Sequence, residues 1–405
     1  MDYKKHLKKK LRVWMIKKMK LRSLKNTNVS GKTVLYRSPY DIGVKETNGI
    51  LEITDPSRIK ATLPTLKYLL AQNCKIVILT YVKRPDGKVV ENLRTTPHAK
   101  ALSKLLNRPV KKVNECVGEN VQKEIANLLP QEILMLENTR FHPEEMVDDD
   151  NFAQKLAKNG EIVVFDAFPQ THRLHASTTG ILRHLPSCAG FYLEKEIKML
   201  TQVVTNPQKP LTIIIGGAKI SDKVDAINNL LPIADTILLG GGVANVFLKA
   251  QGKEVGNSYL EDTFVDKVKK EKKDWVQYSQ EILKKAGGKI QVPTDFAISN
   301  SRILDIGPET QEAFAKIITQ SKTVFWNGPM GKFEDERFAK GSKAVMKAIS
   351  KVKGTTVVAG GDTIEAVRKY GHLKNFTHIS LAGGATLEFL AGTKLPALEM
   401  LRKEY

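Results

Sequence analysis

The chain has 405 residues, about two to three domains' worth, so a single small module is excluded. Hydrophobic residues make up 41% and charged residues 26%, which excludes a disordered, collagen-like or membrane-embedded chain. The formal net charge of +21 is unusual, and it favours nucleic acid, an anionic membrane or anionic small molecules as partners.

Nearly half of this charge lies in the first 26 residues, which carry nine lysines, two arginines and one acid. The longest apolar run there is Val13–Ile16, whereas a signal-peptide core needs roughly 7 to 15 apolar residues and a spanning helix about 20. We therefore expect a cytoplasmic protein with a basic extension at 1–18. Its three cysteines match neither a disulfide framework nor a metal-site spacing, so we expect buried free thiols at Cys74, Cys116 and Cys188.

After the extension, short β-branched runs alternate with amphipathic stretches. Apolar runs of about five residues are typical of strands buried on both faces, and the strand-helix repetition indicates parallel sheets. Ten or so strands exceed the usual sheet, so we expect an α/β protein with two sheets in two domains. The expected strands are 33–37, 75–80, 132–136, 161–165, 211–215, 236–239, 289–292, 323–326, 356–358 and 377–380, and the expected helices include 58–72, 98–106, 151–158, 222–231, 310–319 and 338–352.

The segment 191–204 has the pattern of one helix, and Pro207 and Pro210 interrupt the chain before the next strand. This helix is either a hinge between two domains or an ordinary surface helix, and the pattern alone leaves both open.

In the second half, glycines gather directly after apolar strands, at 216–217, 240–242, 328–331, 360–361 and 383–384. Glycine at a strand end lets the backbone approach a ligand, and helix N-terminal N–H groups favour anions. Five such clusters predict a phosphate-binding crevice. Lys219 and Lys223 lie near these clusters and are expected to neutralise phosphate charge. We expect Asp362 to bind Mg²⁺ and Glu334 to accept a hydrogen bond from a ribose.

Two familiar nucleotide motifs are absent. A phosphate-binding GxxxxGK[ST] loop ending at Gly31-Lys32-Thr33 would need glycine at position 26, which is Asn26. The GxGxxG pattern at Gly240 and Gly242 lacks its last glycine, because position 245 is Asn245. The nucleotide site therefore depends on the other groups.

The first half carries arginines without glycine clusters: Arg58 opens a helix, and Arg84, Arg140 and Arg173 follow predicted strands. A planar guanidinium matches carboxylate and phosphate bidentately, so several at one sheet edge indicate a small, highly anionic substrate.

At these residues the sequence resembles phosphoglycerate kinases, from about Met19 to the end. The stretches that carry the resemblance are Leu136–Glu145, Asp166–Phe168, His172–Ser177, Gly216–Lys223, Gly240–Gly242, Asp305–Pro308, Trp326–Gly331 with Phe333 and Glu334, Gly360–Thr363 and Gly383–Ala385.

The resemblance implies two Rossmann-like three-layer α/β/α domains that close about a hinge helix. Its expected divisions are a phosphoglycerate-binding domain at 19–190, the hinge helix at 191–206, a nucleotide-binding domain at 207–392 and a segment at 393–405 that returns to the first domain. The implied reaction is reversible, Mg²⁺-dependent phosphoryl transfer between 1,3-bisphosphoglycerate with ADP and 3-phosphoglycerate with ATP, in glycolysis and gluconeogenesis, by a monomer. The transfer is in line and has no covalent enzyme intermediate, so positioning and charge stabilisation supply the catalysis.

The resemblance also implies roles for single residues. Arg58 and Lys219, with backbone N–H groups near Gly383 and Gly384, would stabilise the transferring group. The substrate side would comprise Asp41, Arg58, Tyr81, Arg84, Arg140, His172 and Arg173. The nucleotide side would comprise Gly217, Ala218, Lys219, Lys223, Gly241, Gly307, Asn327, Glu334, Gly360, Gly361, Asp362 and Thr363, with Asp362 toward the metal.

The chain departs from the family pattern mainly on the glycerate side. Pro39 replaces an aspartate that accepts a hydrogen bond from the glycerate hydroxyl, Asp41 replaces an asparagine, and Tyr81 replaces a substrate-side histidine. Pro169 and Gln170 stand where the family prefers Gly-Thr. Several lost hydrogen bonds could weaken substrate affinity roughly ten- to a thousandfold unless Asp41, Tyr81 and Lys83 compensate. Because Arg58, Lys219 and the Gly360–Thr363 turn are all present, we expect a working but divergent kinase.

Two alternatives remain open. The first is that the chain is a non-catalytic nucleotide-binding relative or a kinase for another phosphorylated acid. The second is that it is a binding protein whose main partner is nucleic acid. The second predicts basic residues interleaved with aromatics, whereas the expected lysine-rich helices, such as Lys267–Lys273, also carry acid and are typical of solvated faces.

Overall fold

The computed structural model describes residues 19–266 and 271–402, so the basic extension at 1–18 lies outside the described residues. The described chain divides into two compact units. The N-terminal unit contains residues 19–198 and 394–402, and the C-terminal unit contains residues from Met199 to Thr393. Helix α7 (Phe191–Thr205) begins in the first and ends in the second.

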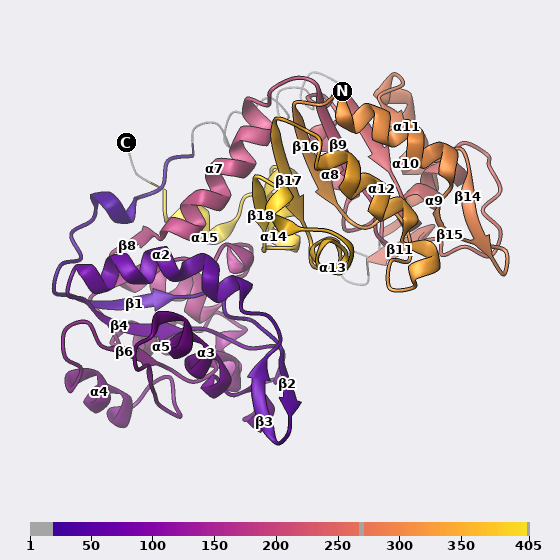
Figure 1. Cartoon of the computed structure of the whole chain (residues 1–405). Helices are drawn as coiled ribbons and strands as arrows, with labels where there is room; N and C mark the ends of the chain where they lie inside the picture. Colours follow the sequence, from indigo (N-terminus) through magenta and orange to yellow (C-terminus); the bar gives the residue numbers. More distant parts are fainter. Residues whose placement is uncertain (1–18, 267–270, 403–405) are drawn as a thin grey trace. The chain divides into compact units, whose positions relative to one another are not determined.

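The N-terminal unit is built on a six-stranded parallel sheet with the order β5-β6-β4-β1-β7-β8 (Figure 1). The central strands β1 and β4 are buried except for the first residue of each, as expected for strands covered on both faces. The strands are β1 (Thr33–Arg37), β4 (Lys75–Leu79), β5 (Lys111–Lys112), β6 (Ile133–Met135), β7 (Ile162–Phe165) and β8 (Ser187–Ala189). The α-helices are α2 (Ser57–Ala71), α3 (Thr96–Leu106), α4 (Glu119–Ala126), α5 (Asp150–Ala157), α6 (Ile181–His184) and α15 (Pro396–Met400).

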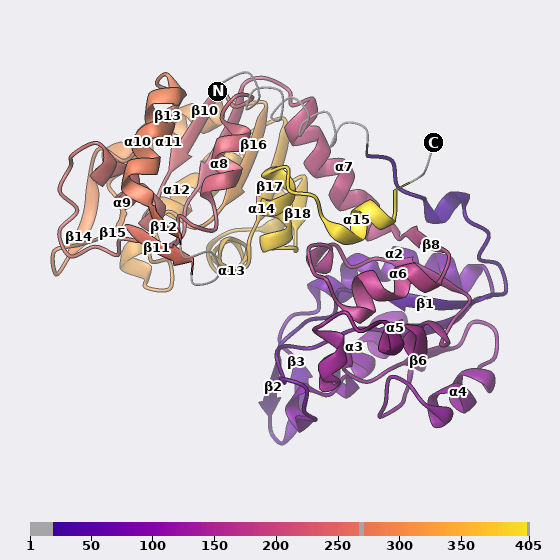
Figure 2. The same ribbon diagram turned by 180° about the vertical axis from the view of Figure 1, so that it is seen from behind.

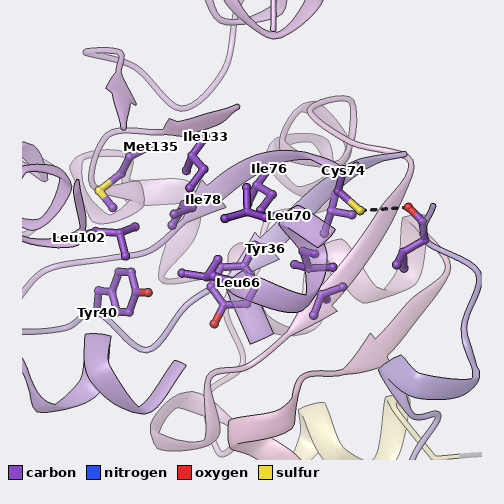
Figure 3. Close-up of a cluster of buried hydrophobic side chains, with 14 of the residues drawn as sticks. Tyr36, Tyr40, Leu66, Leu70, Cys74, Ile76, Ile78, Leu102, Ile133 and Met135 are labelled. Carbon is purple, nitrogen blue, oxygen red and sulfur yellow. Dashed lines mark hydrogen bonds between the residues drawn. The ribbon is translucent and has the colours of Figure 1, made fainter. Parts of the chain in front are cut away.

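The core of this unit lies where α2 and α3 pack on the sheet. Figure 3 shows Leu66 and Leu70 of α2 and Leu102 of α3 among the strand residues Ile76 and Ile78. Cys74 also lies in this core and donates its S–H to the Val29 carbonyl at 3.1 Å. All three cysteines are buried and free, as the sequence predicts.

The C-terminal unit repeats this architecture, with a six-stranded parallel sheet in the order β13-β10-β9-β16-β17-β18 (Figure 2). Strands β9 and β16 are central and fully buried. The strands are β9 (Leu211–Ile215), β10 (Thr236–Leu239), β13 (Ile290–Gln291), β16 (Thr323–Asn327), β17 (Thr355–Ala359) and β18 (His378–Ser380). The α-helices are α8 (Val224–Leu230), α9 (Gly241–Ala250), α10 (Trp275–Ala286), α11 (Pro308–Thr319), α12 (Lys340–Ile349), α13 (Gly361–Tyr370) and α14 (Gly384–Leu390).

Chain order places a switch point in this second sheet. From β9 the chain moves outward to β10 and β13, then returns to β16 and moves the other way to β17 and β18. In open parallel sheets, ligands bind at the carboxyl ends of the strands where the strand order reverses in this way.

Three hairpins lie outside the two large sheets: β2 (Val44–Thr47) with β3 (Ile50–Ile53), β11 (Thr263–Asp266) with β12 (Glu271–Asp274), and β14 (Phe296–Ser299) with β15 (Arg302–Ile306). The sequence did not predict these hairpins. The helix expected at Lys267–Lys273 is wrong for Glu271–Lys273, which lie in β12, and residues 267–270 lie outside the described residues. The Asn48-Gly49 pair carried a signal, because both residues adopt the positive φ of a tight hairpin turn, at 52° and 74°.

The prediction of an α/β protein with two parallel sheets is confirmed by these units. The C-terminal segment lies in the N-terminal unit, where Arg22 N donates to Leu401 O at 2.9 Å and Ala397 N donates to Thr171 O at 3.2 Å. In the described part of the chain, no helix has the length and apolar character that crossing a membrane requires.

Candidate functional site

A cleft of about 750 Å³ lies at the switch point of the C-terminal unit. It is formed by the segments that follow β9, β16, β17 and β18. Eleven of the residues expected to bind nucleotide or stabilise the transferring group line it: Gly217, Ala218, Lys219, Lys223, Asn327, Gly360, Gly361, Asp362, Thr363, Gly383 and Gly384. The structure thus brings together residues that are up to 167 positions apart in the sequence.

Some glycines of this region are required by close backbone packing. A Cβ on Gly216 would lie 2.1 Å from Pro329 O, and one on Gly328 would lie 2.1 Å from Gly216 O. Gly328 also has a φ of +92°, which L side chains rarely adopt. The loops after β9 and β16 therefore pack backbone against backbone beneath the cleft.

Other glycines face open space. A Cβ added at Gly361 or Gly384 would meet nothing within 4 Å, and neither residue has a positive φ. Both stand at the start of helices, α13 and α14, where free N–H groups and the helix dipole favour an anion. Packing does not explain these two glycines, whereas close approach of a phosphate does.

The polar side chains of the cleft are linked through Asn327. Its Nδ2 donates to Ala359 O at 3.0 Å, which directs its Oδ1 toward the Lys223 ammonium at 2.5 Å. Thr363 joins the same network, because its Oγ1 accepts a hydrogen bond from Gly328 N at 2.7 Å. These contacts fix the loops after β16 and β17 to each other.

Two lysines of the cleft differ in environment. Burial lowers the pKa of Lys223, while the neighbouring Asp222 and Asp362 carboxylates oppose that change. Lys219 is exposed at the tip of the loop after β9. Lys223 is therefore held in the wall of the cleft by Asn327, whereas the Lys219 side chain is exposed to solvent.

Asp362 is the carboxylate that the sequence predicts to meet a metal ion. It is exposed in the first turn of α13 and lines the cleft beside Gly361. Among the described residues, no group of three or more His, Cys, Asp or Glu is arranged to hold a metal. One carboxylate suits Mg²⁺ that arrives on a nucleotide, because Mg²⁺ commonly takes one or two carboxylates and completes its shell with phosphate and water.

Three residues expected on the nucleotide side do not line the cleft. Gly241 lies beneath it, where a Cβ would meet Gly217 O at 2.7 Å. Gly307 caps α11 and packs against Asp295, and Glu334 is exposed, with its carbonyl accepting from Lys369 Nζ at 2.9 Å.

In the N-terminal unit, the expected substrate-side residues follow β1, β4, β6 and β7. Asp41 connects three of their segments, because its Oδ1 accepts from Lys83 N at 2.9 Å and its carbonyl accepts from Arg58 Nη1 at 2.5 Å. This arrangement holds Arg58, the second residue of α2, beside the loop after β1.

The remaining substrate-side cations differ in exposure. Arg84 and Arg173 are exposed, whereas Arg140 is 5% exposed and donates from Nη1 to Lys83 O at 2.6 Å. His172 is half-buried, and burial together with Arg173 lowers its pKa to about 4. His172 is therefore neutral near pH 7, so Arg84, Arg140 and Arg173 supply the positive charge.

The sequence analysis missed two buried groups beside these cations. Arg37 is the last residue of β1 and is fully buried, with one guanidinium nitrogen, Nη2, that has no partner. His175 is also buried, and burial together with Arg140 and Arg37 lowers its pKa to about 3. Arg37 stands at a strand end like Arg84 and Arg140, so the same rule could have selected it.

Residues of the cleft were also missed. Asp222, Asp225, Glu388 and Thr393 line it but lie outside the glycine clusters. The sequence prediction selected residues that follow strands directly, and these four belong to later parts of the loops or to helices.

Comparison with known proteins gives one consistent result. A family model described as phosphoglycerate kinase matches residues 24–393. The phosphoglycerate kinase of Moorella thermoacetica is 42% identical over 94% of this chain and 99% of its own, and that of Pelotomaculum thermopropionicum is 39% identical over 95% and 99%.

Solved structures agree with the sequence comparisons. Phosphoglycerate kinase from Coxiella burnetii matches with a TM-score of 0.80 and 34% identity, over 94% of this chain and 99% of that one. The enzyme from Pyrococcus horikoshii matches with a TM-score of 0.81 and 35% identity, over 94% and 98%.

Proposed function

The chain belongs to the phosphoglycerate kinase family, and from this premise we propose that it transfers a phosphoryl group reversibly between ATP and the carboxyl group of 3-phosphoglycerate. The products in that direction are ADP and 1,3-bisphosphoglycerate, and the reaction belongs to glycolysis and gluconeogenesis. The observation that carries this proposal is the glycine-lined cleft of the C-terminal unit, in which two helix N-termini and two lysines line one space of about 750 Å³.

The nucleotide phosphates would lie along the segments after β9, β17 and β18. Gly361 and Gly384 leave room for the phosphates, and the N–H groups at the starts of α13 and α14 would donate to them. Lys219 and Lys223 would neutralise part of their charge. Asp362 would hold Mg²⁺, which supplies neutralisation of the β- and γ-phosphates when it is bound with the nucleotide.

The phosphorylated acid would bind to the cations of the N-terminal unit. Arg84, Arg140 and Arg173 offer planar guanidinium groups for its phosphate, and Arg58 would face its carboxylate. Neutral His172 would donate or accept a hydrogen bond without adding charge.

The proposed reaction forms no covalent bond between the protein and the transferred group. A carboxylate oxygen of 3-phosphoglycerate attacks the γ-phosphorus of ATP, the bond from that phosphorus to the β,γ-bridging oxygen breaks, and the electron pair leaves with ADP. No proton needs to be removed, because the attacking carboxylate is already ionised. Catalysis then consists of orienting the two ligands and stabilising the transferring group, which Arg58, Lys219 and the N–H groups near Gly383 and Gly384 would do. Helix α7, which belongs to both units, is the proposed hinge for bringing the ligands together.

A coupled assay that consumes ATP tests this function. We expect turnover with 3-phosphoglycerate and little or none with unphosphorylated glycerate, because the three arginines would then lack their phosphate. A Lys219→Ala variant prepared in parallel should lose most of the rate and so controls for contaminating kinases. Turnover with a different phosphorylated acid alone would contradict the proposed substrate. Intact ADP binding without any turnover would contradict the proposed activity.

We further propose that the enzyme acts as a cytoplasmic monomer on small-molecule ligands, with no membrane or nucleic-acid partner. The family membership supports this, and size-exclusion chromatography together with cell fractionation would test it.

A further inference from the structure

Tyr81 lies at the centre of the buried part of the arginine cluster. It follows β4 in the segment Thr80–Val82, and its side chain is only 4% exposed. The contacts that the structure gives its ring are with protein side chains.

Those neighbours are two guanidinium groups and one imidazole. The Cζ atom of Arg140 lies 3.6 Å from the centroid of the Tyr81 ring, and that of Arg37 lies 5.1 Å from it. The His175 ring meets it edge-on, with centroids 5.7 Å apart and an interplanar angle of 63°. Both guanidinium distances are within the range of cation–π attraction, and the Arg140 contact is close stacking.

Arg140 has few other restraints. Its Nη1 donates to Lys83 O at 2.6 Å, while its buried Nε has no partner. The charge of a buried guanidinium must be compensated, and a carboxylate would do so at the cost of competing with an anionic ligand. The electron-rich face of an aromatic ring compensates the charge without competing for the donors.

The local backbone supports this stacking. Asn138 joins the two loops, since its Oδ1 accepts from both Val82 N at 3.0 Å and Arg140 N at 3.1 Å, and its Nδ2 donates to Val82 O at 2.9 Å. Tyr81 and Arg140 are therefore held next to each other by the residue that precedes the 3₁₀ turn of Thr139–Phe141. The hydrogen bonds of Asn138 to both loops therefore support the contact between Tyr81 and Arg140.

We propose that Tyr81 is a positioning residue that holds the Arg140 guanidinium by its ring face and keeps its positive charge available to the phosphorylated acid. This inference rests on the proposed function, because it takes Arg140 as part of the substrate side. It gives Tyr81 a different role from the direct substrate contact that the resemblance implies. The ring face alone holds the guanidinium, and the phenol hydroxyl is not needed for this role.

Two substitutions separate the ring from the hydroxyl. Tyr81→Phe keeps the face and should leave the KM for 3-phosphoglycerate within about twofold of wild type. Tyr81→Leu removes the face and should raise this KM about five- to thirtyfold, a change that corresponds to about 1 to 2 kcal/mol. The kcat and the KM for ATP should stay unchanged, because the loosened guanidinium belongs to the acid site.

A double-mutant cycle with Arg140→Met distinguishes positioning from a general structural effect. If Tyr81 acts through Arg140, the Tyr81→Leu change should have no further effect on 3-phosphoglycerate binding once Arg140 is replaced. Binding is measured by calorimetry on the full-length chain, and thermal unfolding of each variant reports any loss of fold. A merely structural role would lower the unfolding temperature and weaken binding in both backgrounds.

Three results would overturn the inference while leaving the proposed function intact: Tyr81→Phe as damaging as Tyr81→Leu, a wild-type KM in Tyr81→Leu, or additive effects in the cycle. A wild-type chain that neither binds nor phosphorylates 3-phosphoglycerate would overturn both.

Discussion

At the scale of single residues, the chain differs from the family pattern where the glycerate hydroxyl is expected. Pro39 is buried after β1, between the end of that strand and the buried Tyr40. Proline has no side-chain acceptor, so a hydrogen bond that an aspartate would accept is missing. The Asp41 carboxylate is not free to serve as this acceptor, because its Oδ1 already accepts a hydrogen bond from Lys83 N.

We predict that Pro39→Asp lowers the KM for 3-phosphoglycerate about two- to tenfold, the range that one hydrogen bond of about 0.5 to 1.5 kcal/mol allows. Pro39→Ala is the matched control, since it removes the ring without adding an acceptor, and it should not lower the KM. Steady-state kinetics with saturating ATP measures both. An unchanged or higher KM in Pro39→Asp would refute this explanation of the departure.

His98 of α3 is a residue whose charge state affects stability. It is fully buried, its ring nitrogen Nε2 lies 3.0 Å from Ile42 O, and its Nδ1 has no partner. Burial is the main cause that lowers its pKa to about 4, although the hydrogen bond to Ile42 opposes this. The unfolded chain, with an ordinary histidine pKa near 6.5, therefore binds this proton more readily than the folded chain.

The sign follows directly: between about pH 6.5 and pH 4, stability falls as the pH falls, by about 1.4 kcal/mol per pH unit from this one group. We predict that His98→Gln, which keeps a donor for Ile42 O, gives a shallower pH dependence. Urea unfolding followed by circular dichroism at pH 7.5, 6 and 5 measures it. His172 and His175 remain in both proteins, so equal slopes would show that His98 does not contribute.

At the scale of elements, the glycines of the C-terminal unit fall into two classes that the sequence alone does not separate. Gly216 is packed against the backbone of Pro329, whereas Gly361 faces open space at the start of α13. Packing therefore determines one class and ligand approach the other.

We predict opposite effects of alanine at these two positions. Gly216→Ala should destabilise the C-terminal unit by about 1 to 3 kcal/mol, because the methyl group overlaps the Pro329 carbonyl. Gly361→Ala should leave the unfolding temperature nearly unchanged while raising the KM for ATP several-fold. Differential scanning calorimetry and steady-state kinetics on the same preparations measure both. A destabilised Gly361→Ala protein with a normal KM would contradict the division.

The elements also show how far sequence reasoning reaches. Ten of the twelve strands of the two sheets were predicted, because buried parallel strands form continuous β-branched runs, as in β9 and β16. The short edge strands β5 and β8 were missed, because neither forms such a run. The cleft was predictable because strand order brings the segments after separate strands to one edge. The Tyr81–Arg140 stacking was not, because it depends on side-chain direction and on the two loops that Asn138 joins.

At the scale of the whole molecule, the two units each contain a six-stranded parallel sheet, with different strand orders, and they carry different functional groups. The C-terminal unit presents backbone N–H groups and lysines in a glycine-lined cleft, and the N-terminal unit presents arginines. The net charge of +21 is a weaker indication of function than the positions of these lysines and arginines. The proposed chemistry uses about six cations at strand ends and in the loops and helix starts beside them, and it has no need of the basic extension.

The measurement that tests the central claim most directly is the fate of the γ-phosphoryl group. The full-length chain is incubated with γ-labelled ATP, Mg²⁺ and 3-phosphoglycerate in the presence of hydroxylamine, which attacks an acyl phosphate at its carbonyl carbon. We predict that 3-phosphoglycerate is converted to its C1 hydroxamate, that the label appears as inorganic phosphate, and that Lys219→Ala lacks this activity. Label retained on the acid as a hydroxylamine-resistant phosphoester, or no dependence of label release on 3-phosphoglycerate, would contradict transfer to the carboxyl group.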